Sequence, residues 1–237
     1  MTPRRPLPVA DAESAVAAIE EDIVLGRMHP RQRITEDELL ERFSGLKRHV
    51  VRDMLATLER LGLVERRKNI GALVRSFTPR EVRELYAMRE LLETEAARRM
   101  PLPPPAEALA RLAAIQRDHD SAVGRRNLRE VYRTNLAFHR ELFALAGNEV
   151  LERAIAEYAR QTHAIRFSTI VSPDYREQAR EEHHAMILAL ETKDRARLVA
   201  LCRKHLRPAR DAYLEHLETD PAADKVNGPV AADDRSR

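Results

Sequence analysis

The sequence lacks the features of secreted and membrane-bound proteins. It has one cysteine, Cys202, which excludes a disulfide within the chain, and that thiol is expected to pack inside a helix. No apolar run approaches the roughly 18 residues of a membrane-spanning helix. The first residues carry charge but lack the apolar stretch of a secretion signal. A cytoplasmic protein that does not associate with a membrane is therefore expected.

A large excess of one charge is also missing. The 237 residues include 41 lysines and arginines against 38 aspartates and glutamates, which leaves a formal charge of +3. This balance is compatible with nucleic-acid binding but does not by itself argue for it. The distribution is more informative, because the stretch from Arg42 to Arg52 has no acidic residue and a second basic cluster lies at 66–68.

The spacing of apolar residues in the first third predicts a winged helix-turn-helix. Thr35 and Glu38 have the form of a capping box, which begins a short helix. Gly62 ends the longer helix that follows, and two short strands joined by a basic turn come next. These elements form a predicted N-terminal domain at residues 11–76, preceded by a flexible arm at 1–10. Helices are expected at 11–26, 35–43 and 46–61, and strands at 63–66 and 71–75.

The remainder of the chain is predicted to be helical throughout. Thr78, Pro79 and Glu81 combine an N-cap, a proline at the first helical position and a capping glutamate, so a helix begins there and the domain boundary falls near Phe77. The fold class is therefore mainly α: an N-terminal winged helix-turn-helix plus a C-terminal all-α helical bundle at 77–218. The expected segments are helices at about 79–99, 105–123, 126–146, 149–169, 173–191 and 194–217, and a disordered tail at 219–237.

The helix expected at 46–61 has the two faces that a DNA-recognition helix needs. Its apolar stripe leaves Arg48 and Arg52, four residues apart, on a different face, and His49 lies at the same end. The second helix of a helix-turn-helix lies in the major groove, where an arginine reads guanine through two hydrogen bonds. The alternative is that these are solvated charges on an ordinary amphipathic helix. Further basic residues suited to phosphate or minor-groove contact are Lys47, Arg66, Arg67 and Lys68.

Three histidines in the second half each fall on the apolar stripe of a different expected helix. They are His139, which follows Asn135 by four residues, His183 and His205. Three imidazoles are a typical ligand set for zinc or a similar divalent metal. The alternative is that each is a hydrogen-bonded histidine of the core. His184 falls off the stripe and is expected to be exposed.

Two other functions compete with DNA-binding regulation. A helical metal-dependent hydrolase would use the histidines and a bound water, with Glu181 and Glu182 as the nearest acid or base in sequence, but no His-Glu-x-x-His motif supports it. A non-catalytic helical adaptor would account for the second half of the chain, but it leaves the face of Arg48 and Arg52 without a purpose. Salt-dependent binding to a DNA duplex separates the adaptor from a regulator.

The first third resembles the GntR family of transcription regulators. The resemblance rests on Arg48-x-x-Val51-Arg52-x-x-Leu55 and on the ending Leu-x-x-Leu-Gly-Leu-Val at 58–64. Two features depart from the family: Val50 stands where proline is common, and the turn at 44–45 is one residue longer. The resemblance, which with the helical half covers about 11–217, implies that Arg48 and Arg52 contact DNA and that Gly71 is the wing glycine. The full set expected at double-stranded operator DNA is Arg33, Lys47, Arg48, His49, Arg52, Arg66, Arg67, Lys68 and Gly71.

The second half resembles the FCD-type ligand-binding domain of the FadR subfamily. Its signature residues read here as Asn135, His139, His183 and His205, with asparagine where the family has aspartate. The resemblance implies a divalent metal, with zinc expected, whose open positions take a small carboxylate metabolite. Asn135 offers a carbonyl oxygen but no charge, so the metal would keep its double positive charge among neutral ligands.

The same resemblance implies how the protein works. Arg89 is a candidate clamp for the carboxylate, and the alternative is an i,i+4 helix pair between Arg89 and Glu93. A homodimer is expected, whose two winged helices meet half-sites about one helical turn apart. The resemblance favours a repressor that is released from its operator by the ligand.

Overall fold

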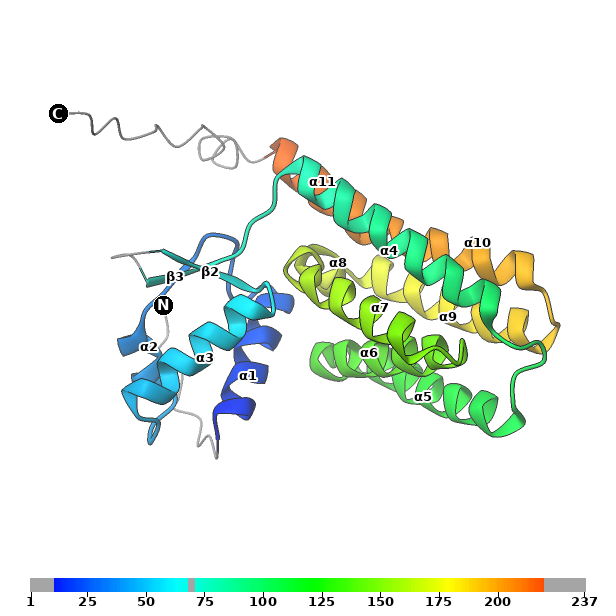
Figure 1. Cartoon of the computed structure of the whole chain (residues 1–237), viewed down its shortest axis with the longest axis horizontal. Coiled ribbons are helices and arrows are strands. Elements are labelled where there is room, and N and C mark those ends of the chain that lie inside the picture. The colour runs from blue at the N-terminus through cyan, green and yellow to red at the C-terminus, as the bar shows by residue number, and fades with distance from the viewer. Residues whose placement is uncertain (1–10, 68–70, 220–237) are drawn as a thin grey trace.

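The computed structural model describes residues 11–67 and 71–219 (Figure 1). The arm predicted at 1–10, the tail beyond 219 and Lys68 lie outside the described residues. The described part consists of a small α/β unit at the N-terminal end and a larger, purely helical unit, as Figure 1 shows on its left and right. The predicted fold class is confirmed.

The N-terminal unit has three helices and a three-stranded antiparallel sheet. Thr35 and Glu38 cap α2 reciprocally, as the capping box predicts. The sheet order is β1-β3-β2, and β1 was not expected, because two residues that pair with a strand forty positions later leave no periodic signal. The elements are α1 (Ala12–Val24), β1 (Arg33–Ile34), α2 (Glu36–Arg42), α3 (Arg48–Arg60), β2 (Val64–Arg67) and β3 (Gly71–Val74).

The helix α3 buries the stripe that the sequence predicts. Val51, Met54, Leu55 and Leu58 are all at most 3% exposed and pack against α1 and α2. The helix ends before Gly62, whose φ of +71° is a left-handed conformation that glycine adopts without steric cost. Burial of this stripe therefore fixes which face of α3 remains turned to solvent.

The C-terminal unit begins at α4, where Thr78 and Glu81 form a second capping box with Pro79 in the first turn. The helix α4 packs on α7 and α10, and α5 packs on α6 and α9. Figure 1 shows α4 running beside α10 and α11 along one side of the bundle. The helices are α4 (Pro79–Arg99), α5 (Ala106–Gly124), α6 (Leu128–Ala144), α7 (Glu149–Gln161), the 3-10 helix η1 (His163–Ile165), α8 (Phe167–Val171), α9 (Pro173–Glu191), α10 (Arg195–His205) and α11 (Arg207–Thr219).

Two of the expected helices are interrupted. The segment predicted as one helix at 149–169 divides into α7, η1 and α8, because the hydroxyl of Thr162 donates to the carbonyl of Ala159 and the chain tightens into a 3-10 turn. The segment predicted at 194–217 divides at Leu206, because Pro208 has no N–H to continue the helical hydrogen bonds. Both predictions of a continuous helix were wrong.

One hydrophobic cluster joins the two units. The winged-helix core around Ile19, Leu58 and Val74 also contains Ile165 from η1 and Tyr213 from α11. The hydroxyl of Tyr213 accepts a hydrogen bond from the backbone N–H of Phe77 over 3.1 Å, so the connection into α4 is held to the last helix. The domain boundary expected near Phe77 stays a prediction, since this packing crosses it.

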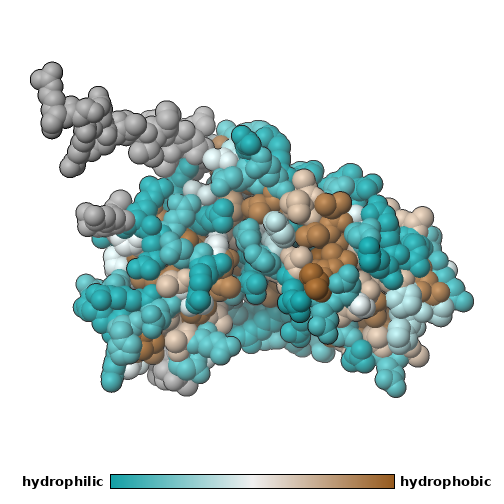
Figure 2. Space-filling model, viewed as in Figure 1, coloured by the Kyte–Doolittle hydropathy of each residue, from teal (hydrophilic) through white to brown (hydrophobic). Residues whose placement is uncertain are grey.

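The surface in view is mostly hydrophilic, with a patch of hydrophobic residues over the C-terminal unit (Figure 2). Met88 and Leu91 of α4 are among the exposed large apolar side chains, at 36% and 59%. Among the described residues, no helix is both long and apolar enough to span a bilayer.

Candidate functional site

The exposed face of α3 carries the basic residues expected at DNA. Lys47 is the N-cap residue, but its side chain makes no capping hydrogen bond, so the amides of the first turn are not capped by it. Arg48, His49 and Arg52 are all exposed on the turns that follow. Free amides and three basic groups at one helix end are suited to phosphate and base contacts.

Both arginines of this face are engaged by carboxylates of α2. Nη2 of Arg48 lies 2.9 Å from Asp37, and Nε of Arg52 lies 2.9 Å from Glu36. The hydrogen bond from Arg52, against the smaller effect of burial, lowers the pKa of Glu36. The pairs are exposed and therefore weak, so a phosphate can replace the carboxylates.

The basic residues of the sheet that are expected at DNA lie on its two outer strands. Arg66 and Arg67 are exposed on β2, whereas Arg33 is exposed on β1 at the opposite edge. Gly71 has a φ of +100°, and a Cβ at this position would come within 3.2 Å of the Ile34 carbonyl oxygen. Glycine is therefore required where β3 begins, which agrees with its expected place in the wing.

The three histidines expected at a metal converge in the helical unit. His139 comes from α6, His183 from α9 and His205 from the end of α10, and one nitrogen from each lies within 4.8 Å of the others. The Nε2 atoms of His139 and His205 are 3.1 Å apart. Two nitrogens bound to one tetrahedral zinc at about 2.05 Å are separated by about 3.3 Å. The spacing therefore fits two ligands of one metal ion.

Hydrogen bonds orient two of these rings toward the common centre. Nδ1 of His183 donates to Oε1 of Gln116 over 3.0 Å, and Nδ1 of His205 donates to Oε2 of Glu182 over 2.8 Å. With the proton held on Nδ1, each Nε2 carries the lone pair that a metal needs.

Burial favours the neutral form of two of these imidazoles, His139 and His183. Burial lowers the pKa of both His139 and His183 well below the usual histidine value, and the neighbouring His205 lowers them further. Nε2 of His183 is buried and has no hydrogen-bond partner in the described part of the chain. A buried, unpaired nitrogen is costly unless it binds something, so these residues fit a metal ion.

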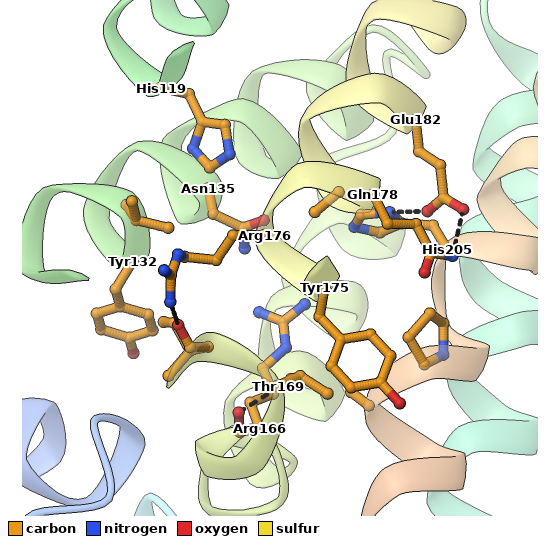
Figure 3. Close-up of a pocket in the computed structure, with 15 residues that line it drawn as sticks. His119, Tyr132, Asn135, Arg166, Thr169, Tyr175, Arg176, Gln178, Glu182 and His205 are labelled. Carbon is orange, nitrogen blue, oxygen red and sulfur yellow. Dashed lines mark hydrogen bonds and ion pairs between the residues drawn. The ribbon is translucent and has the colours of Figure 1, made fainter. Parts of the chain in front are cut away.

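A small pocket of about 80 Å³ lies beside the cluster and contains Asn135 and His205 (Figure 3). Asn135 makes no side-chain hydrogen bond within the described residues, which leaves its carbonyl oxygen available. Figure 3 also shows the guanidinium groups of Arg166 and Arg176 directed into the pocket. No carboxylate in the described ranges pairs with either group, and Arg176 donates only to the carbonyl of Ile170.

A larger cavity of about 460 Å³ is lined by His139 of the cluster and by residues of α1, α4, α6, α7 and η1. Arg166 lines both the small pocket and the larger cavity, whereas Arg89 lines the larger cavity. Arg89, however, forms a buried ion pair with Glu93 at 2.8 Å and donates to Thr162 over 3.1 Å. The i,i+4 pair weighed against a carboxylate clamp is thus present, whereas Arg166, which lines both the small pocket and the larger cavity, pairs with no carboxylate of the described residues.

Sequence reasoning missed Arg166, Arg176 and the neighbouring His119. His119 is 1% exposed, donates from Nδ1 to the Thr134 hydroxyl over 2.9 Å and has an unpaired Nε2. Burial lowers its pKa to about 4. The three residues carry no local motif, and only the helix packing brings them to the pocket.

The residues considered as a catalytic acid or base are placed unfavourably for that role. Glu182 is buried but is occupied by His205, by Gln178 at 2.9 Å and by Lys204 at 3.3 Å. These hydrogen bonds outweigh the effect of burial and lower the pKa of Glu182 to about 2, so it holds no proton at neutral pH. Glu181 is exposed.

Comparison with protein families defines the class of the molecule. Residues 11–74 match the model of bacterial regulatory proteins of the gntR family, and residues 84–208 match the FCD domain. Proteins of both families are regulators of transcription rather than enzymes. The chain therefore belongs to the GntR family of DNA-binding transcription regulators, in the FadR-type branch that carries an FCD domain.

Individual relatives agree with this assignment. A protein of Paraburkholderia xenovorans (strain LB400), named as the uncharacterized HTH-type transcriptional regulator BphR, is 26% identical over 212 residues, covering 85% of this chain and 86% of its own length. A GntR regulator structure from Rhodococcus sp. RHA1 has a TM-score of 0.72 at 18% identity, covering 86% of this chain and 97% of that one. The E. coli McbR/YncC structure has a TM-score of 0.73 at 16% identity, with coverage of 88% and 99%. At this identity, the two structures bear on the fold alone.

Proposed function

We propose that this regulator is a repressor that leaves its operator when a small carboxylate metabolite binds at a metal-containing site in the FCD domain. Ligand-responsive DNA binding follows from the family, whereas the metal, the carboxylate and the sign of regulation are the proposal. The observation that carries it is the convergence of three imidazoles beside a pocket whose guanidinium groups have no carboxylate partner among the described residues.

The metal ligands would be His139, His183 and His205, with the oxygen of Asn135 as a fourth. Zinc suits three imidazoles, and the bound ion supplies a concentrated positive charge with a position open to an anion. Because all four protein ligands are neutral, none of that charge is cancelled before the effector arrives.

The surroundings favour a carboxylate with an apolar body. Arg166 lines both the small pocket and the larger cavity, and its guanidinium suits bidentate pairing with a carboxylate. Arg89 remains a candidate for the same ligand, which it would bind while also paired with Glu93. The larger cavity also has apolar walls from Leu136 and Phe143. Its volume of about 460 Å³ is in the range for small-molecule sites and suits a small metabolite.

The DNA-binding form would be a homodimer. Its two recognition helices would meet half-sites about one helical turn apart, with Arg48 and Arg52 reading base edges. Met88 and Leu91, three residues apart on the outer face of α4, offer an apolar surface on which a second copy can pack. A Leu91→Glu variant that becomes monomeric in light scattering would support this face, and an unchanged mass would exclude it.

The decisive test measures metal content and DNA binding in the same preparations. We expect stoichiometric zinc in the wild-type protein and in the matched control His184→Ala, whose histidine is exposed, but not in His139→Ala or His183→Ala. Binding to a duplex from the region upstream of the gene should weaken steeply between two salt concentrations. Metal-free wild-type protein that still binds DNA would contradict the metal-centred site, but it would remain consistent with a DNA-binding regulator.

A further inference from the structure

The helix α1 of the DNA-binding unit supplies part of the wall of the larger cavity. Glu20 lines that cavity together with His163 of η1 and Arg166. Its Oε1 accepts a hydrogen bond from Nδ1 of His163 over 2.6 Å and one from the hydroxyl of Tyr132 over 3.0 Å. A carboxylate from one unit is therefore bound inside the cavity of the other.

The groups around this carboxylate form a built site. His163 is 3% and Tyr132 is 5% exposed, and both aim their polar atoms at the same oxygen. Arg160 and Arg133 also line the cavity, as does the acidic Glu152. Two convergent donors with basic groups nearby are the arrangement that binds a carboxylate, whichever molecule carries it.

The charge of Glu20 agrees with this description. Burial raises its pKa, but the hydrogen bond and the field of His163, the Tyr132 hydroxyl and Arg160 outweigh burial, so the pKa lies below its usual value. The neighbouring Glu21 pairs with Arg129 of α6 at 2.5 Å and with Arg133 at 3.5 Å. Two consecutive carboxylates thus hold α1 to the helical unit.

We infer that His163 and Tyr132 form a carboxylate-binding site which Glu20 fills from α1, and that a free carboxylate entering the cavity competes with Glu20 for it. The inference rests on the proposed function in taking the effector to be a carboxylate. Displacement of Glu20 removes one of the two carboxylate links between α1 and the bundle, which shifts the population toward states with a repositioned winged helix.

The competition predicts a measurable weakening of carboxylate binding by the intact protein. If Glu20 fills the site roughly nine-tenths of the time, the apparent affinity for a free carboxylate falls about tenfold. Removing the carboxylate of Glu20 therefore has to tighten binding. A merely structural role for Glu20 predicts the opposite, because a loosened cavity binds less well.

The test titrates benzoate, whose ring suits the apolar walls, into full-length protein by calorimetry at constant ionic strength. The proteins are wild type, Glu20→Gln, Glu20→Ala and the matched control Glu13→Gln, which removes an exposed charge from the same helix. We expect both Glu20 variants to bind benzoate about tenfold more tightly than wild type and Glu13→Gln. Adding His163→Ala to Glu20→Ala should abolish that gain. Saturating benzoate should also speed amide exchange in α1 of the wild-type protein.

The outcomes separate this inference from the proposed function. Equal benzoate affinity in wild type and both Glu20 variants, or no binding by Glu20→Ala at millimolar concentrations, would overturn the competition. Zinc content and salt-dependent duplex binding, measured on the same proteins, do not depend on Glu20. Their loss in the wild type would overturn the proposed function instead.

Discussion

Oε2 of Glu182 accepts a hydrogen bond from Nδ1 of His205 over 2.8 Å, which sets the tautomer of that histidine. The same carboxylate is ionised, since hydrogen bonds from His205 and Gln178 outweigh burial and lower its pKa to about 2. An ionised partner on Nδ1 makes Nε2 a stronger donor to a metal. Glu182 thus precedes His183 in the sequence but supports the other proposed ligand, His205, in the folded protein.

Replacing Glu182 should weaken metal binding without removing a ligand. We expect Glu182→Gln to lower zinc affinity by about 10- to 100-fold, the usual effect of losing a supporting carboxylate. Competition with a chromogenic chelator measures this affinity. Glu181→Gln, an exposed neighbour, is the control and should behave as the wild type. Equal affinity in the two variants would show that His205 needs no such support.

Asn135 is the position where charge can be added to the metal site. We expect Asn135→Asp to tighten zinc binding roughly tenfold, because an anionic oxygen binds a dication better than an amide oxygen. Asn135→Ala should weaken it. If neither variant changes the affinity in the same chelator competition, Asn135 is not a ligand and the three histidines act alone.

The carboxylates of α2 compete with DNA for the recognition helix. Glu36→Gln should raise duplex affinity by up to about fivefold, since an exposed pair contributes at most about 1 kcal/mol. Fluorescence anisotropy with a labelled duplex measures the change, and Glu41→Gln, exposed on the same helix, is the control. Arg52→Ala should lower affinity, and weaker binding by Glu36→Gln would refute the competition.

The buried His119 should make stability depend on pH. Burial lowers its pKa from 6.5 to about 4, so the unfolded chain takes up a proton first as the pH falls. The contribution of His119 to the free energy of unfolding is therefore fully present above pH 6.5 and is lost as the pH falls from 6.5 to 4. The loss amounts to at most roughly 3 kcal/mol. Urea unfolding with chelator at pH 5 and 7 tests this. His119→Asn should reduce the dependence, to which the buried His139 and His183 also contribute, whereas exposed His184→Asn should leave it unchanged.

Local sequence signals were sufficient for much of the fold. The capping residues around Thr35 and Thr78 fixed where α2 and α4 begin, because capping is decided within four residues. The apolar stripes also placed His139, His183 and His205 on inward faces, and the packing then brought them together. Periodicity did not locate the breaks at Thr162 and Leu206, since the apolar pattern continues through both.

The rest of the site depends on which helices pack together. Arg166 lies on the short η1–α8 connection that was expected to be continuous helix. Its position in the lining of both the small pocket and the larger cavity follows from that break. The contact between Glu20 and His163 joins residues 143 positions apart in different units. No spacing rule relates such residues, and only the tertiary arrangement identifies them.

The hydrophobic cluster shared by the two units affects how the protein can be divided. Ile165, Leu206 and Tyr213 cover apolar side chains of the winged helix, so an isolated 11–76 segment would expose that surface to water. Such a fragment should be less stable than the same segment in the full chain and prone to self-association. The winged helix is consequently not an independent domain on a flexible linker. Packing on the helical unit contributes to its stability and sets its orientation.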